Sequence, residues 1–161
     1  MKFIDNILKT IESIMKIVVT VLFFGMLVSL SVQVISRYVF NTGFSWTEES
    51  ARYMMVWLVF SGAVVVSKRD EHISITVVEE MWPKTVPTMK FIQRIIVSVY
   101  SIIVMYYGIL TLRIASLQTS PNMKIGMNII YAIYPIAMFL ILVYTIRLLI
   151  CQFQKKEGIN K

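Results

Sequence analysis

The sequence IVVTVLFFGMLVSLSVQVIS, residues 17–36, contains no ionisable side chain. A helix needs about 20 mostly apolar residues to cross a bilayer core about 30 Å thick. Because no water reaches the backbone there, such a segment must satisfy its hydrogen bonds internally, as a helix does. Three further uncharged apolar stretches, fenced by basic residues, follow at 53–67, 95–112 and 125–146. The sequence therefore predicts an all-α integral membrane protein with four transmembrane helices.

We expect a single membrane domain over residues 1–161. Apolar residues make up 57% of the chain and the mean hydropathy is +0.72, so the segments outside the bilayer are too short for a soluble core. Ser29-Leu30-Ser31 loosely imitates a signal-peptide cleavage site. The uncharged run before it is longer than a usual signal core, so we expect a retained span. Cys151 is the only cysteine, which excludes a disulfide framework and a multi-cysteine metal site.

The basic residues are divided unequally between the two faces of the predicted membrane. The net charge is +7, but Lys and Arg lie at span ends rather than in one patch, so we expect contact with membrane lipids and not with nucleic acid. With four spans, both termini and the loop 68–94 share the face that holds twelve of the sixteen basic residues. The other face holds Arg37, Arg52, Arg113 and Lys124. The positive-inside rule then predicts cytoplasmic N- and C-termini.

Residues 1–16 predict an amphipathic helix ahead of the first span. Apolar side chains from Phe3 to Val18 recur at three- and four-residue spacing, and polar ones such as Lys9 and Glu12 fill the opposite face. We interpret this arm as an interfacial helix at the cytoplasmic membrane surface. The alternative is a simple continuation of the first span into water.

The second span is predicted to begin at Trp46, earlier than its uncharged stretch. Asn41-Thr42-Gly43 is a turn signal. Ser45-Trp46-Thr47-Glu48 fits a capping box, in which the Ser45 hydroxyl accepts from a backbone amide and Glu48 returns to the cap. A helix from Trp46 to Ser67 is about 33 Å long at about 1.5 Å per residue, enough to cross the bilayer. The expected spans are therefore about 17–37, 46–67, 93–113 and 125–148.

Charged residues at the start of this helix can form two pairs. Glu48 and Arg52 are four residues apart in the favoured order, and Glu49 and Arg52 are three apart. The simpler interpretation is a solvated helix start with weak surface pairs. His72, the only histidine, lies in the loop 68–94, which we expect to be irregular or helical. Because no partner stands at ligand spacing, the pattern favours a loop contact over a metal site.

Three residues indicate how the last two spans pack. Gly108 and Gly126 are candidates for close helix approach. Pro135 predicts a kink or a locally loosened turn in the fourth helix, because proline has no N–H to donate.

The spans carry no candidate chemistry of their own. The four apolar stretches contain no Asp, Glu, His, Lys or Arg, and Gln33 and Asn128 are their strongly polar side chains besides scattered Ser and Thr. No zinc-protease motif, nucleophile turn or phosphate-binding loop is present in the sequence. We therefore predict no catalytic, cofactor-binding or metal-binding residue, and no enzyme. An alternative, a self-sufficient four-span homodimeric small-molecule exporter, would be expected to carry a membrane-embedded acid, which the stretches lack.

A family resemblance is carried by the run Arg37-Tyr38-Val39-Phe40-Asn41, then Phe44-Ser45-Trp46-Thr47-Glu48-Glu49, Ala51-Arg52, Gly62-Ala63 and His72-Ile73. These residues resemble the small membrane subunit of tripartite ATP-independent periplasmic (TRAP) transporters. The four-span plan and the region 131–135 are similar too, so the resemblance covers essentially the whole chain. The chain departs from the family pattern at Ser74 and Thr76, where an acid is common, and near Gly126, where a proline is common.

The resemblance implies a function and partners. In that family a large multispan membrane subunit carries the substrate and sodium sites, and a periplasmic substrate-binding protein delivers an organic acid, a carboxylate or sugar acid. The small subunit packs against the stationary scaffold of the large one in the bacterial inner membrane. We expect a charged cluster to brace the turn between the first two helices and to present it to the large subunit, near where the binding protein docks. The cluster consists of Arg37, Glu48, Glu49 and Arg52. The resemblance implies subunit-interface or structural roles for Arg37, Ser45, Trp46, Glu48, Glu49, Arg52 and His72.

Overall fold

The computed structural model describes residues 2–69 and 86–159, and their regular structure is helical. The helices are α1 (Lys2–Tyr38), α2 (Ser45–Arg69), α4 (Val86–Ala115), α5 (Met127–Tyr131) and α6 (Ile133–Ile159). Four segments within them are long and apolar enough to cross a membrane: Leu8–Tyr38, Ser45–Ser67, Thr88–Ala115 and Met127–Ile150. The predicted all-α membrane fold is therefore confirmed, and the chain is an integral membrane protein.

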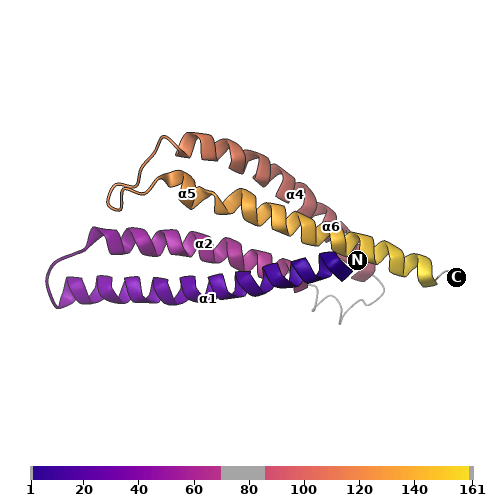
Figure 1. The fold of residues 1–161 in the computed structure, drawn as a ribbon, viewed down its shortest axis with the longest axis horizontal. Coiled ribbons are helices and arrows are strands. Elements are labelled where there is room, and N and C mark those ends of the chain that lie inside the picture. The colour runs from indigo at the N-terminus through magenta and orange to yellow at the C-terminus, as the bar shows by residue number, and fades with distance from the viewer. Residues whose placement is uncertain (1, 70–85, 160–161) are drawn as a thin grey trace.

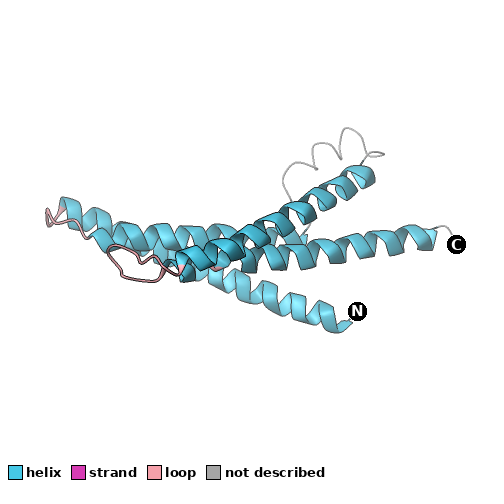
Figure 2. Ribbon diagram, turned by 90° about the horizontal axis from the view of Figure 1, so that it is seen from above, coloured by secondary structure: helices cyan, strands magenta, loops and turns pink. Residues whose placement is uncertain are grey.

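The helices form two hairpins that lie side by side (Figure 1). The first hairpin consists of α1 and α2, and the second of α4 with α5 and α6. The hairpins meet through α2 and α6, so the helices are packed in the order α1, α2, α6, α4. Both chain ends lie at one end of this arrangement, where the helices diverge (Figure 2). We call this the terminus end, and we call the opposite end, with the α1–α2 turn and the α4–α5 loop, the loop end.

The N-terminal arm is helical, as predicted, and it continues into the first span without a break. A single helix, α1, runs from Lys2 through residue 16 to Tyr38. On the arm, Lys16 pairs with Glu12 at 2.7 Å across one helical turn. The buried Leu8 belongs to the protein core, so the apolar stripe of the arm is partly used for packing within the chain.

The loop predicted at 68–94 is shorter on both sides than the sequence suggested. Helix α2 extends to Arg69, and α4 already begins at Val86, ahead of the predicted third span. Pro87 is tolerated there because the first-turn amides of a helix have no intrahelical acceptor. The rest of the predicted loop, with His72, lies outside the described residues.

Small residues let α1 and α2 approach closely. A Cβ added at Gly25 would lie 3.1 Å from the Met54 sulfur. One helical turn further, the buried Ser50 hydroxyl donates to the Thr47 carbonyl at 2.9 Å, and it forms a hydrogen bond with the Ser29 hydroxyl at 3.1 Å. Small residues and interhelical hydroxyl bonds are the usual means of helix association in lipid, because the hydrophobic effect does not distinguish lipid from protein there.

The fourth span is divided at Ala132, between α5 and α6. Pro135 cannot donate to the Tyr131 carbonyl four residues earlier, which interrupts the helix at this point as the sequence predicted. Gly108 of α4 faces the break, since a Cβ added there would lie 3.3 Å from Pro135 Cδ. The prediction of close approach is thus confirmed for Gly108. It is wrong for Gly126, whose nearest neighbour is the Asn128 side chain of its own turn.

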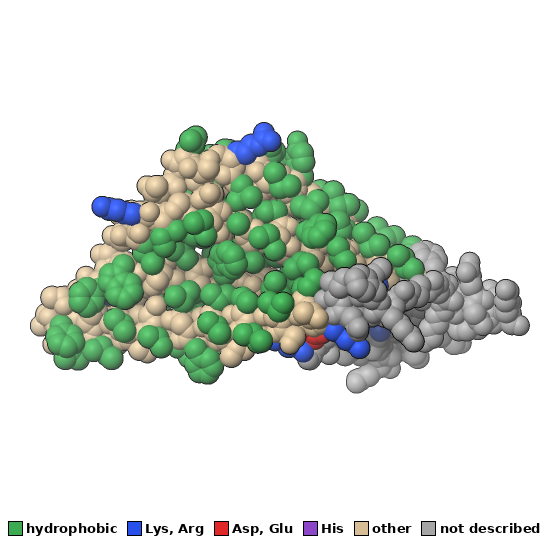
Figure 3. Space-filling view, viewed as in Figure 1, with side chains coloured by type: hydrophobic (Ala, Val, Ile, Leu, Met, Phe, Trp, Pro, Cys, Tyr) green, Lys and Arg blue, Asp and Glu red, His purple; other side chains and the backbone are tan. Residues whose placement is uncertain are grey.

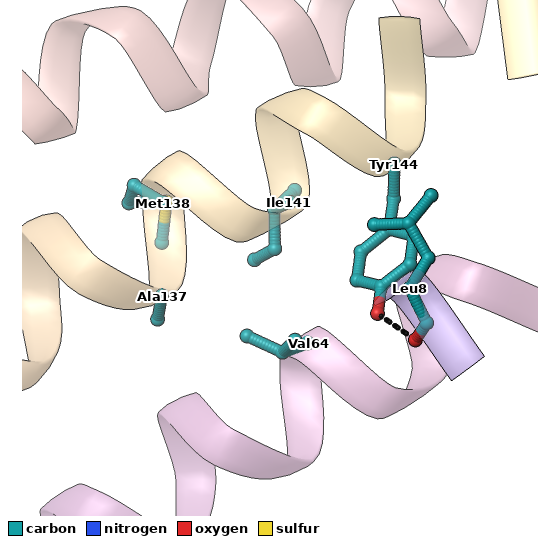
Figure 4. Packing of buried hydrophobic residues seen from close by; sticks show 6 residues of the cluster. All are labelled: Leu8, Val64, Ala137, Met138, Ile141 and Tyr144. Carbon is teal, nitrogen blue, oxygen red and sulfur yellow. Dashed lines mark hydrogen bonds between the residues drawn. The ribbon is translucent and has the colours of Figure 1, made fainter. Parts of the chain in front are cut away.

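The hydrophobic core lies between α2 and α6 and reaches the start of α1 (Figure 4). The Tyr144 hydroxyl donates to the Leu8 carbonyl at 2.9 Å, which attaches the N-terminal arm to the last helix. The core is formed by Leu8, Val64, Ala137, Met138, Ile141 and Tyr144.

Helices α1 and α4 are the outermost in the packing order, and their apolar side chains stay largely exposed. Exposure exceeds 60% for Val21 and Phe24 on α1 and for Ile96 and Tyr107 on α4. In the space-filling view hydrophobic side chains cover the middle of the face, and Lys and Arg appear toward its two ends (Figure 3). This distribution is suited to lipid or to another membrane protein.

Candidate functional site

The turn between α1 and α2 depends on one left-handed residue. After Tyr38 the Thr42 amide donates back to the Ser36 carbonyl at 3.0 Å, and Asn41 adopts a φ of 51°. Asparagine tolerates this conformation better than most residues because its short polar side chain can bond locally. The chain therefore reverses at the predicted turn, and it is Asn41 rather than Gly43 that carries the positive φ.

The start of α2 differs from the predicted capping box. The helix begins at Ser45, and the Phe44 carbonyl accepts both the Thr47 amide at 3.1 Å and the Thr47 hydroxyl at 2.7 Å. Within the described chain the Ser45 hydroxyl makes no hydrogen bond. The capping box is wrong because the helix starts one residue earlier, so Glu48 stands in the fourth helical position and turns to Arg52 instead.

Two adjacent acids at this helix start have different surroundings. Glu48 is exposed and pairs with Arg52 at 3.1 Å, with side-chain exposures of 59% and 70%. Glu49 is 8% exposed and is directed toward the second hairpin. Of the two pairs that the sequence allowed, the structure forms Glu48–Arg52, while Glu49 has other partners.

Glu49 joins the two hairpins at the loop end. Its carboxylate accepts the Asn122 and Met123 backbone amides, both at 3.1 Å, and the Tyr53 hydroxyl at 2.6 Å. We call these four residues the Glu49 clasp. The clasp connects α2 to the α4–α5 loop. From the sequence we expected Glu49 to brace the α1–α2 turn, but its hydrogen bonds go to the other loop.

The α4–α5 loop is shaped to present those amides. The Ser120 amide donates to the Ile125 carbonyl at 2.8 Å, and Lys124 has a φ of 53°. Between these points the chain turns so that two successive N–H groups point to one carboxylate oxygen, the arrangement of a small anion nest. Hydrogen bonds to an ionised acceptor are stronger than neutral ones, and this clasp uses only uncharged donors.

A pocket of about 430 Å³ adjoins the clasp. Its walls come from the end of α1, the start of α2 and the α4–α5 loop. Five of the seven residues that the resemblance selected lie in its lining. Among described residues Arg37 forms no ion pair. The lining residues are Gln33, Arg37, Gly43, Phe44, Ser45, Glu48, Glu49, Arg52, Pro121 and Asn122.

The other two selected residues do not join this group. Trp46 is 48% exposed beside Phe44, with ring centroids 6.5 Å apart. His72 lies outside the described residues. Sequence reasoning missed the role of Asn122 and Met123, because a main-chain amide has no side-chain signature. The sequence Ser120-Pro121-Asn122 is a turn signal, but it does not indicate a contact with α2.

A second charged contact joins helices at the terminus end. The Arg94 guanidinium of α4 donates to the Leu148 carbonyl at 3.3 Å and to the Gln152 side-chain oxygen, both on α6. No group of three metal-ligating side chains occurs in the described ranges 2–69 and 86–159. The site can therefore hold helices together and offer charged or polar contacts, but it shows no arrangement for covalent chemistry.

Comparison with known proteins identifies similar sequences. The model of the family described as "Tripartite ATP-independent periplasmic transporters, DctQ component" matches residues 26–155. A protein of Haemophilus influenzae named as a TRAP transporter small permease protein is 45% identical over 60 residues, 37% of each chain. The sialic acid TRAP transporter small permease protein SiaQ of Vibrio cholerae is 28% identical over 102 residues, 62% of this chain and 59% of that protein. The matched segments thus span about a third and about three fifths of these relatives.

Proposed function

Because the chain belongs to the family of DctQ components of tripartite ATP-independent periplasmic transporters, we propose that it scaffolds the large membrane subunit of such a transporter. The transporter takes up an organic acid, delivered by a periplasmic binding protein and driven by sodium. The observation that carries this proposal is the family match over residues 26–155 of a four-helix membrane chain. The subunit itself performs no chemistry.

The exposed apolar helices support a scaffolding role. The middle of each span lacks ionisable side chains, so a sodium or proton path has no obvious residues in this chain. Helices α1 and α4 offer long apolar surfaces on opposite edges of the packing order. One such surface faces lipid and the other packs on the large subunit, which enlarges the fixed part of the transporter against which the moving part works.

The loop end supplies the interface residues of this proposal. The Glu49 clasp fixes the second hairpin to the first, and it thereby sets the position of Arg37, Ser45, Glu48 and Arg52 around the pocket. Trp46 is exposed beside them. We assign this surface to contacts with the large subunit near the docking place of the binding protein. His72 belongs to the loop 68–94 on the opposite, cytoplasmic face, and we assign it to a subunit contact or structural role there.

The orientation follows from charge. Both termini lie at the same end of the helices, and the face they share holds twelve of the sixteen basic residues. The positive-inside rule then puts the termini in the cytoplasm of an inner membrane and the loop end in the periplasm. Cys151 will react only with thiol reagents that enter the cytoplasm, and a cysteine at Thr42 only from the outside. Labelling of both from one side would refute this orientation.

The substrate is assigned only as a class. One relative is named for sialic acid, which is a sugar acid, and this supports an organic acid for the present transporter. The solute-selecting residues belong to the other subunits in this proposal. Purified alone in liposomes, the chain should accumulate no organic acid, with or without a sodium gradient. Sodium-driven uptake by the lone chain would instead support a self-sufficient transporter.

Co-purification tests the scaffold directly. The tagged chain, expressed together with the large subunit of its transporter, should retain that subunit through detergent extraction. Glu49→Gln should weaken the association, because the loop end loses its fixed position, and Glu48→Gln should leave it intact as a control of equal charge change. Loss of the large subunit from the wild-type chain would overturn the proposal. If both variants retain equal amounts of the large subunit, the loop end is not part of the interface.

A further inference from the structure

The pocket at the loop end extends a polar lining into the first span. Gln33 lies inside the apolar stretch 17–36, one helical turn before Arg37, and both side chains line the pocket. On the opposite wall Glu48 and Arg52 stand on α2. A polar wall that continues into a transmembrane helix is costly in contact with lipid tails alone, so the pocket is suited to a polar occupant.

The charges that line the pocket leave Arg37 available to a ligand. Glu49 is engaged by two loop amides and the Tyr53 hydroxyl, and Glu48 pairs with Arg52. Arg37 forms no ion pair within the described ranges and its side chain is exposed. A guanidinium with free donors recognises phosphate or carboxylate through paired hydrogen bonds. The four charged residues of the lining sum to zero, so the pocket as a whole does not select a charge, and Arg37 is the side chain in it that can receive an anion.

Aromatic side chains around the pocket indicate its depth in the membrane. Tyr38, Phe40, Phe44 and Trp46 are between 47% and 78% exposed at the α1–α2 turn. Exposed Trp and Tyr at a span end form the belt that marks the headgroup level of a bilayer. The neighbouring Val34 is 55% exposed on α1 and offers apolar surface toward the middle of the span.

We propose that this pocket binds the phosphate of a phospholipid headgroup, with Arg37 as its main contact and Gln33 as a second donor. At about 430 Å³ it is within the usual size of small-molecule sites. The acyl chains lie along the exposed apolar side of α1. The bound lipid covers the polar wall that would otherwise face hydrocarbon. The pocket is formed by this chain alone, so its lipid binding can be measured without the large subunit or the binding protein. In the assembled transporter of the proposed function, the lipid would lie between this surface and the large subunit.

Native mass spectrometry of the full chain tests the site. The wild-type protein is extracted in mild detergent, delipidated and given phosphatidylglycerol or phosphatidylethanolamine, and the fraction with one bound lipid is measured. Arg37→Gln should lower that fraction about tenfold, because one charge-assisted contact to the phosphate is lost. Arg37→Lys should recover part of the binding. Arg113→Gln, the same charge change at the loop end but outside the pocket, should bind as the wild type does.

Each other outcome decides against the site. Equal loss in Arg37→Gln and Arg113→Gln would mean that lipid responds to net charge and not to the pocket. Displacement of the lipid by inorganic phosphate or glycerol phosphate would assign the pocket to a soluble anion. Absence of lipid from the wild type would refute the proposal outright. If circular dichroism shows that Arg37→Gln is not folded, Gln33→Leu is measured instead. Unchanged lipid binding in Gln33→Leu would overturn the assignment.

Discussion

At both the loop end and the terminus end of this molecule, a charged side chain forms hydrogen bonds to uncharged groups of another element. At the loop end Glu49 accepts from two backbone amides and a tyrosine hydroxyl. At the terminus end Arg94 donates to a helix carbonyl and to an amide side chain. In both places one charged side chain binds uncharged groups of another element. The charged group is the hydrogen-bond acceptor at the loop end and the donor at the terminus end.

The backbone groups that bind Glu49 and Arg94 differ in whether they keep another hydrogen bond when the charged side chain is removed. The Leu148 carbonyl lies inside α6 and keeps its own helical hydrogen bond, because a carbonyl has two lone pairs. The Asn122 amide lies in a loop and has no helix to satisfy it. A buried donor without a partner destabilises the protein by its full desolvation penalty, whereas an acceptor that keeps one hydrogen bond adds only a small penalty. The loop end should therefore be the more sensitive of the two.

Substitution of Glu49 should have the largest effect on stability. Glu49→Ala removes the acceptor of the Asn122 amide and one of the two acceptors of the Met123 amide, which also donates to the Ser120 hydroxyl. It also detaches the α4–α5 loop from α2, and we expect a total cost of about 3 kcal/mol of unfolding free energy. The measurement is unfolding of the purified chain by denaturing detergent in mixed micelles, followed by helical circular dichroism. Glu48→Ala is the matched control, and because its pair with Arg52 is exposed the loss should stay within about 0.5 kcal/mol. Equal losses in both variants would show that the clasp is no stronger than a surface pair.

Two glycine substitutions in the middle of the spans give stability changes with which the effects at the two ends can be compared. Gly108→Val should destabilise the chain by about 2 kcal/mol, because a Cβ at this position would lie only 3.3 Å from Pro135 Cδ and the further methyl groups would press on the proline ring. Gly62→Ala has open space within 4 Å and should stabilise by about 0.5 to 1 kcal/mol through helix propensity alone. The same detergent titration compares them. A neutral Gly108→Val would mean that α4 can move away from the α5–α6 break without loss.

The helices were predictable because they depend on composition that repeats along the chain. An uncharged stretch such as 17–36 has to be a helix wherever its neighbours lie, and Pro135 has to interrupt one, since both follow from local hydrogen bonding. The Glu49 clasp depends on residues 73 and 74 positions away in the sequence. Nothing in the side chains of Asn122 and Met123 indicated it, because only their backbone takes part. The packing order α1, α2, α6, α4 likewise follows from tertiary contacts that no local pattern encodes.

At the terminus end the expected loss is smaller. Arg94→Met keeps most of the apolar stem and removes the guanidinium, and it should cost about 1 kcal/mol because the Leu148 carbonyl keeps its helical hydrogen bond. Arg113→Met, an exposed arginine near the end of α4, is the control and should change stability by less than about 0.5 kcal/mol. A loss for Arg94→Met equal to that of Glu49→Ala would contradict the proposed difference between donors and acceptors.

The smallest effect separates the predicted helix start from the observed one. Ser45→Ala would cost about 1 kcal/mol if Ser45 capped α2, as the sequence pattern indicated. In the structure its hydroxyl has no partner among described residues, so the change should stay within about 0.5 kcal/mol. Thr47→Val is the paired measurement. Thr47 is fully buried and its hydroxyl donates to the Phe44 carbonyl at 2.7 Å, so its loss should cost about 1 kcal/mol. If Ser45→Ala proved the more costly of the two, the helix would begin at Trp46 in solution, and Glu48 would be free to return to the cap instead of pairing with Arg52.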